Sequence, residues 1–132
     1  MADKIPFQIE YIPYQKNPRD SREVHGWFRL TLDSKIVPDL SGNELHLPGY
    51  LFHPERLLSC CRNIAQNESS SLSFSDNGFE LLSFSPESGR VKIRAYNNQS
   101  TEIPKRDAIN KIIDCYKKVC IDNNFEIDEE FP

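Results

Sequence analysis

The chain has 132 residues, 38% of them hydrophobic and 11% aromatic. This composition excludes an intrinsically disordered chain, and the length suits one domain around one continuous core. The net charge is −4, from 20 acidic and 16 basic residues, and it disfavours nucleic acid as a partner because phosphate binding usually requires a basic face.

We predict a single domain over residues 1–132, with an ordered core over 5–123 and an acidic tail over 125–132. The first residues, 1–6, lack the apolar run of a signal peptide, and no later stretch approaches the roughly 18 apolar residues that span a bilayer. The sequence therefore predicts a cytoplasmic protein in which the cysteines stay reduced.

The four cysteines show neither a Cys-x-x-Cys motif nor zinc-like spacing with histidine. We interpret them as small core residues, because free cysteine is among the most buried residue types. Cys60 and Cys61 are adjacent and cannot point the same way from a helix. One of the two is therefore expected to meet solvent or a partner.

Two strands are predicted near the start of the chain. Phe7, Ile9 and Tyr11 alternate with polar residues up to Pro13, as in a half-buried strand. A polar loop over 15–22 follows, and the run 24–33 then forms the second strand, with one apolar face made of Phe28, Leu30 and Leu32 and an opposite face made of Trp27, Arg29 and Thr31. Residues 34–48 form a long connection with room for one short edge strand, and their length makes them a candidate for partner contact.

The first helix is predicted to begin near His53-Pro54-Glu55, since proline suits the first helical position and an acid there complements the helix dipole. It should end around 66–67, with an apolar stripe of Leu57, Leu58, Cys61, Ile64 and Ala65.

Three strands in a meander are predicted next. They lie around Leu72 and Phe74, over 79–84 and over 91–95, and are separated by turns at 76–78 and 86–89. Arg90, Lys92 and Arg94 should form one basic face of an exposed strand, a face too small to indicate nucleic acid. A last helix should run from near Pro104 to about Asp122, with an apolar face of Ala108, Ile109, Ile112, Ile113, Tyr116, Val119 and Cys120.

These elements predict an α+β fold in the order β-β-α-β-β-β-α. The expected architecture is a mostly antiparallel sheet of about five strands with two helices packed on one face.

Sites for chemistry are not evident in the sequence. The histidines His25, His46 and His53 have no metal-ligand spacing, and the glycines form no phosphate-binding loop. The cysteines fall inside helices or near their C-terminal ends, which is the wrong end of the helix dipole to stabilise a thiolate. We therefore predict no catalytic, cofactor-binding or metal-binding residues, and a protein that is not an enzyme.

Two segments are candidates for partner binding. Trp27 lies on the strand face opposite Phe28, where it either packs against the core or the long loop, or anchors an interface as tryptophan often does. The acidic tail is either a solvated terminus or a surface that docks on a basic protein. The predicted partner-binding residues are Trp27, Asp39, Glu44, Glu126, Asp128, Glu129, Glu130 and Phe131.

The order of elements resembles the small cytoplasmic immunity proteins of bacterial toxin systems. The resemblance rests on the strand Gly26-Trp27-Phe28-Arg29-Leu30-Thr31-Leu32, the helix and meander up to Arg90-Val91-Lys92-Ile93, and a final helix with Ile109, Ile112, Ile113 and Tyr116. It covers most of the chain as a pattern of elements and carries over no functional residues. It implies a protein that binds one cognate toxin and performs no chemistry.

The hypothesis from the sequence is therefore a non-catalytic protein-binding module, most concretely an immunity protein whose partner is a toxin domain with a basic surface. The alternatives are a small enzyme or ligand-binding domain with a pocket between sheet and helices, and an adaptor subunit of a larger complex that pairs through a strand edge. Neither nucleic acid nor a membrane is an expected partner, no cofactor is expected, and a homo-oligomer stays open.

Overall fold

A computed structural model describes residues 6–13, 24–37, 47–52, 55–72, 81–123 and 127. These residues form two antiparallel sheets and two helices. In chain order the elements are β1 (Phe7–Pro13), β2 (Val24–Leu32), β3 (Lys35–Ile36), β4 (Leu47–Phe52), α1 (Glu55–Ala65), β5 (Ser70–Leu72), β6 (Leu82–Glu87), β7 (Arg90–Ala95), β8 (Ser100–Pro104) and α2 (Lys105–Asn123).

The first sheet is centred on β2. Strand β1 pairs with it along its whole length, with Phe7 opposite Leu32 and Tyr11 opposite Phe28. The other side of β2 is shared, because β3 pairs near its end and β4 near its beginning. The sheet is thus built from four strands but is three strands wide.

The second sheet is the meander β5-β6-β7-β8, in which each strand pairs antiparallel with the next. Strands β6 and β7 are joined by the two-residue turn Ser88-Gly89, where both residues have positive φ (53° and 79°). This is the type I′ geometry that matches the twist of a hairpin.

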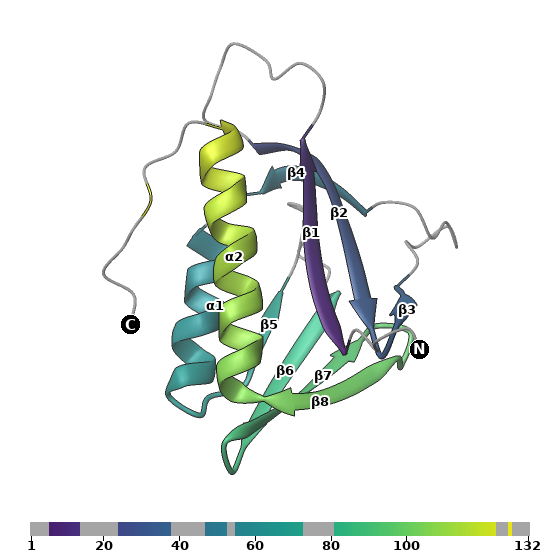
Figure 1. The fold of residues 1–132 in the computed structure, drawn as a ribbon, viewed down its shortest axis with the longest axis vertical. Coiled ribbons are helices and arrows are strands. Elements are labelled where there is room, and N and C mark those ends of the chain that lie inside the picture. The colour runs from purple at the N-terminus through teal and green to yellow at the C-terminus, as the bar shows by residue number, and fades with distance from the viewer. Residues whose placement is uncertain are drawn as a thin grey trace, which may run out of the picture.

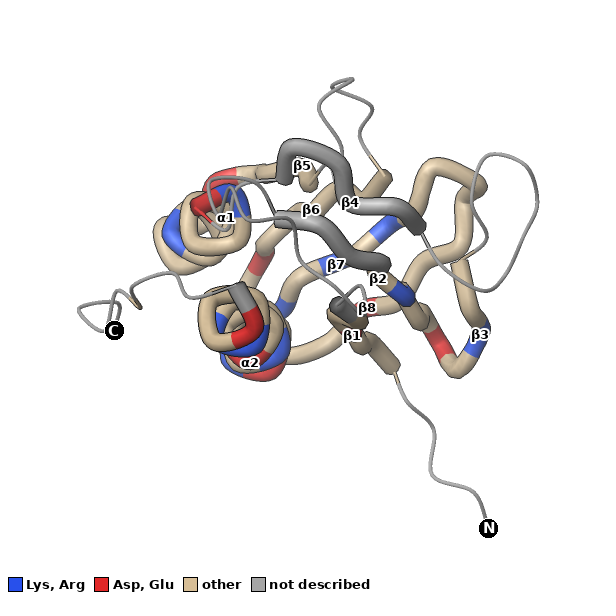
Figure 2. The backbone as a smooth tube through the Cα atoms, turned by 90° about the horizontal axis from the view of Figure 1, so that it is seen from above, with Lys and Arg blue, Asp and Glu red and all other residues tan. Residues whose placement is uncertain are grey.

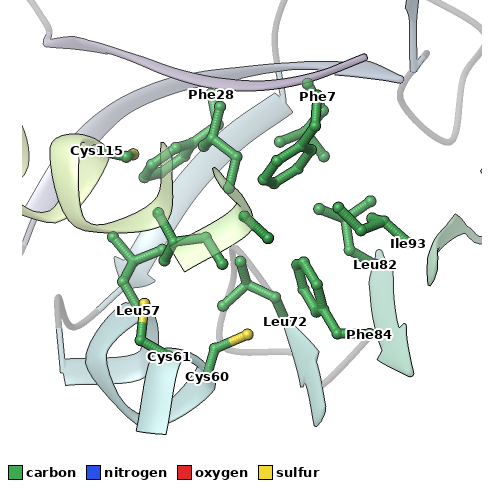
Figure 3. Packing of buried hydrophobic residues seen from close by; sticks show 14 of the residues in the cluster. Phe7, Phe28, Leu57, Cys60, Cys61, Leu72, Leu82, Phe84, Ile93 and Cys115 are labelled. Atoms are coloured by element: carbon green, nitrogen blue, oxygen red, sulfur yellow. The ribbon is translucent and has the colours of Figure 1, made fainter. Parts of the chain in front are cut away.

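One hydrophobic core cluster joins the two sheets and the two helices. The rings of Phe7 and Phe84 meet edge to face across the sheets, with centroids 6.1 Å apart. In Figure 1 the two helices lie side by side, with α2 next to β1 and the β5–β8 sheet beneath. Figure 3 shows residues of both sheets and both helices converging on the same interior.

The α+β class, the antiparallel pairing and both helices were predicted correctly, but the single sheet of about five strands is wrong. The chain forms two sheets with no shared ladder in the part that the structure describes, and its order is β-β-β-β-α-β-β-β-β-α. Strand alternation reveals which face is buried, but it does not reveal which strands pair. β8 was missed because only Ile103 of its five residues is buried, which is too weak a pattern to detect.

The turn predicted over 86–89 is shorter than expected, because Pro86 belongs to β6. In a two-residue hairpin the flanking pair Glu87 and Arg90 is hydrogen bonded, so the next pair, Pro86 and Val91, is not. The nitrogen of Pro86 therefore points away from β7, to the side where β5 pairs only as far as Phe84. Proline is tolerated there because no ladder bond is lost.

One residue of the first helix was predicted on the wrong face. Ala65 was placed on the buried stripe of the first helix, but it is exposed at the end of α1. The predicted loop over 15–22, the turn at 76–78 and Phe74 lie outside the described residues.

Neither of the two described helices has the length and apolar character to cross a membrane.

Candidate protein-binding surface

Trp27 is the one predicted partner-binding residue within the described ranges. Its backbone lies in the middle strand of the first sheet, opposite Ile12 of β1 and Pro48 of β4. The remaining predicted residues lie outside the described part of the chain, namely Asp39, Glu44, Glu126, Asp128, Glu129, Glu130 and Phe131.

One residue of the predicted tail is described. Ile127 is half-buried and packs against the core cluster. It lies beyond the core predicted over 5–123, so the core extends to at least one residue of the 125–132 segment.

All four cysteines are buried and free of disulfides, as expected for core residues. The expectation that Cys60 or Cys61 meets solvent is wrong, because α1 packs on two sides. The thiol of Cys60 reaches Ser70 of β5, whereas Sγ of Cys61 lies 3.8 Å from the carbonyl oxygen of Ile109 in α2. A helix held between a strand and a second helix buries neighbouring positions of its sequence.

Burial also decides the chemistry of these thiols. Desolvation raises the pKa of Cys60 and of Cys115 to about 12, and it raises the pKa of Cys61 and Cys120 as well. The protonated thiol therefore prevails at neutral pH, whereas nucleophiles and metal ligands require the thiolate. These cysteines contribute apolar packing and not a reactive centre.

The described residues, which form the framework of the fold, carry charged side chains of both signs, and the chain as a whole has a net charge of −4. Figure 2 shows charges of both signs along α2.

The outer face of the β5–β8 sheet is the most regular polar surface of this framework. The burial pattern of β7 alternates strictly, with Val91, Ile93 and Ala95 inside and Arg90, Lys92 and Arg94 exposed outside. This confirms the predicted basic strand face. Around β7 the neighbouring strands contribute serines, acidic side chains and one proline. We call this surface the β7 face; it consists of Ser71, Ser83, Ser85, Glu87, Arg90, Lys92, Arg94, Ser100, Glu102 and Pro104.

The two ends of the β7 face differ electrostatically. At the turn end, Nε of Arg90 lies 3.3 Å from Oε2 of Glu102, and its Nη2 donates to the Glu102 carbonyl at 3.1 Å. Glu87 lies opposite Arg90 in the ladder. Acidic residues thus offset the positive charge of this end.

The other end has hydroxyl groups where the turn end has carboxylates. Arg94 lies between Ser83 and Ser100 in the ladder, and Ser71 continues the same row on β5. The hydroxyl of Ser83 donates to the Arg94 carbonyl at 3.5 Å. Lys92 lies between Ser85 and Glu102. The positive charge at the Lys92–Arg94 end is therefore only partly compensated.

The space between sheets and helices is filled by side chains in the described part of the chain. Phe28, Leu57, Leu72 and Phe84 are fully buried there (Figure 3). The enzyme alternative, which expects a pocket between sheet and helices, stays a prediction that these core residues do not test.

The sequence revealed only part of the β7 face. Its basic residues were recognised, but the flanking serines on three other strands become neighbours only through the register of the sheet.

No protein-family model, no curated protein and no solved structure matches this chain.

Proposed function

We propose that the protein is a non-catalytic protein-binding module, and most concretely an immunity protein that neutralises a cognate bacterial toxin. The observation that best supports it is the ordered polar face of the β5–β8 sheet, on which exposed charged side chains of β7 alternate with buried apolar ones. Ordered polar surfaces of this kind can contribute hydrogen bonds and ion pairs to an interface with a partner protein.

The acidic residues provide the attraction to a toxin domain with a basic surface. Glu126, Asp128, Glu129 and Glu130 place four carboxylates within five positions. Complementary charge accelerates encounter and selects the partner more than it increases affinity. Trp27 and Phe131 provide aromatic anchors, the residue class that contributes much of the binding energy at interfaces.

The test is co-expression with the product of the neighbouring gene, since an immunity protein is expected beside its toxin. We expect a one-to-one complex by size-exclusion chromatography and loss of the toxin's activity on addition of this protein. A neighbouring product that neither binds nor is inhibited contradicts the proposal.

Neutralising the tail tests the role of the acids. The triple variant D128N/E129Q/E130Q should slow association with the partner by roughly tenfold at low salt and flatten the dependence of the rate on ionic strength. The matched control E68Q/D107N/D114N removes the same charge from exposed framework positions and should change the rate by less than about threefold. Equal effects of the two triple variants, measured by stopped-flow fluorescence, would show that overall charge and not the tail matters.

A second candidate function, an adaptor subunit, is favoured by the edge of β8. Alternation in the ladder directs the backbone groups of Ser100 and Glu102 away from β7, toward the open edge of the sheet. A strand of another chain can pair at such an edge. However, the backbone nitrogen of Pro104 has no hydrogen to donate, and the Arg90 side chain already donates to the Glu102 carbonyl oxygen. Both features protect the edge from pairing. The module binding through surface side chains is therefore the better supported function.

A further inference from the structure

We propose that the Lys92–Arg94 end of the β7 face is a docking surface for an acidic segment of the protein partner. This inference rests on the proposed function and adds a second contact to it, on a different surface from the acidic tail and with the opposite charge.

The geometry of the sheet provides the first argument. Antiparallel pairing fixes Ser71, Ser83, Arg94 and Ser100 in one row across four strands. With neighbouring strands about 4.8 Å apart, such a row spans roughly 14 Å. Lys92 and Ser85 occupy the next row on the same face. A guanidinium, an ammonium and hydroxyl groups are therefore held on a rigid element, as recognition requires.

The charge of the surface determines the chemistry of the ligand. Arginine binds a carboxylate through two parallel hydrogen bonds, and lysine adds a mobile positive charge beside it. Ser71, Ser85 and Ser100 are small, exposed neighbours that leave both long cations accessible. Because Glu102 and Glu87 offset the turn end, an acidic segment would be attracted mainly to Arg94 and Lys92.

A protein segment fits this surface better than a nucleic acid does. Single-stranded nucleic acids are bound by grooves that combine positive charge with aromatic side chains on which the bases stack. The β7 face carries no aromatic residue, and its three cations share the surface with two carboxylates. Too few phosphates could be neutralised there to provide strong binding.

The small affinity that exposed ion pairs provide also argues against a second copy of this chain as the occupant. The acidic tail of another copy has the right charge, but each exposed ion pair contributes at most about fivefold in affinity. Two or three such pairs cannot hold a stable homodimer. Within a larger interface, the same pairs steer and orient the partner, which is the usual role of charged contacts.

The surface can be tested without knowing the partner. Titration of the ¹⁵N-labelled full chain with hexaglutamate at low salt should shift the amides of Ser85, Lys92, Arg94 and Ser100, with a dissociation constant in the millimolar range. The variant K92Q/R94Q should weaken this binding at least threefold. The matched control K111Q/K117Q removes two exposed cations from α2 and should leave these shifts unchanged.

Three results would overturn the proposal. The first is that hexaglutamate shifts none of these amides. The second is that K92Q/R94Q leaves the shifts unchanged. The third is that the oligonucleotide dT6 binds at the same amides more tightly than hexaglutamate does. Because all four substituted residues are exposed, circular dichroism is expected to show that both variants keep the fold.

The partner complex separates this inference from the proposed function. If K92Q/R94Q forms the complex at the rate of the unaltered protein, the surface proposal fails while the proposed function stands. If hexaglutamate binds as expected but the neighbouring gene product does not bind, the surface proposal stands and the proposed function fails.

Discussion

Burial of the cysteine thiols links the stability of this fold to alkaline pH. The pKa of Cys60 and of Cys115 is raised from 9.0 to about 12 in the folded protein. Between these values the unfolded chain releases the thiol protons while the folded chain keeps them. The contribution of these groups is therefore complete below pH 9 and declines as the pH rises toward 12.

We expect the free energy of unfolding to fall by up to about 1.4 kcal/mol per pH unit for each of these two cysteines above pH 9. Urea denaturation between pH 8 and pH 10.5 measures this slope. The variant C60A/C115A should have lower stability at neutral pH, because cavities form, but a shallower alkaline slope. Equal slopes in the two proteins would show that other groups cause the loss.

The turn residue Ser88 holds a conformation that serine disfavours. Its φ is 53°, next to Gly89 at 79°, and type I′ turns favour asparagine followed by glycine. We predict that Ser88→Asn stabilises the protein by about 0.5 kcal/mol and that Ser88→Val destabilises it by about 1 kcal/mol or more. Thermal unfolding measures both changes. The control Ser85→Asn, in an extended strand of the same hairpin, should not stabilise the protein.

At the scale of elements, the end of α1 is tied to the beginning of α2. Asn67 has φ of 61° and closes α1 in a Schellman motif, in which its N–H donates to the Ile64 carbonyl and the N–H of Glu68 donates to the Asn63 carbonyl. The side-chain oxygen of Asn67 also accepts a hydrogen bond from Nζ of Lys105 at 2.8 Å. One residue thus terminates the first helix and contacts the second.

Two substitutions separate these roles. Asn67→Gly keeps the left-handed conformation and removes only the contact with Lys105, so it should cost a few tenths of a kcal/mol. Asn67→Ala loses both and should cost about 1–2 kcal/mol. Urea denaturation measures the difference. If Lys105→Ala costs as much as Asn67→Ala, the side-chain contact and not the backbone conformation is the larger contribution.

The same elements show how far the sequence predicts this fold. Both helices and strands β1, β2 and β7 follow from apolar periodicity, although α1 also buries Cys60 outside its predicted stripe and β2 also buries Thr31. The division into two sheets does not follow, since β3 and β4 are too short or too irregular to show a period, and their pairing with β2 depends on tertiary contacts. The β7 face was only half predicted, because the sequence identifies the exposed cations but not the serines beside them.

At the scale of the whole molecule, the core joins sheets that share no backbone ladder among the described residues. Phe7 of the first sheet and Phe84 of the second are both fully buried and in edge-to-face contact. The sheets are therefore coupled through side chains, and neither has a separate core within the described part of the chain.

This coupling predicts a cooperative response to damage in either sheet. Phe84→Ala should cost about 3–5 kcal/mol, a large share of the roughly 5–15 kcal/mol typical of a domain. Because β1 and β2 pack on the same cluster, we expect hydrogen-exchange protection to fall by similar factors in β2 and in β7, although only the second sheet is altered. Ser85→Ala, on the outer face of the same strand, should change the stability by less than about 0.5 kcal/mol and leave both sheets protected. Selective loss of protection in β5–β8 would instead show that the two sheets unfold independently, and the shared cluster would then be a contact between two separately stable units.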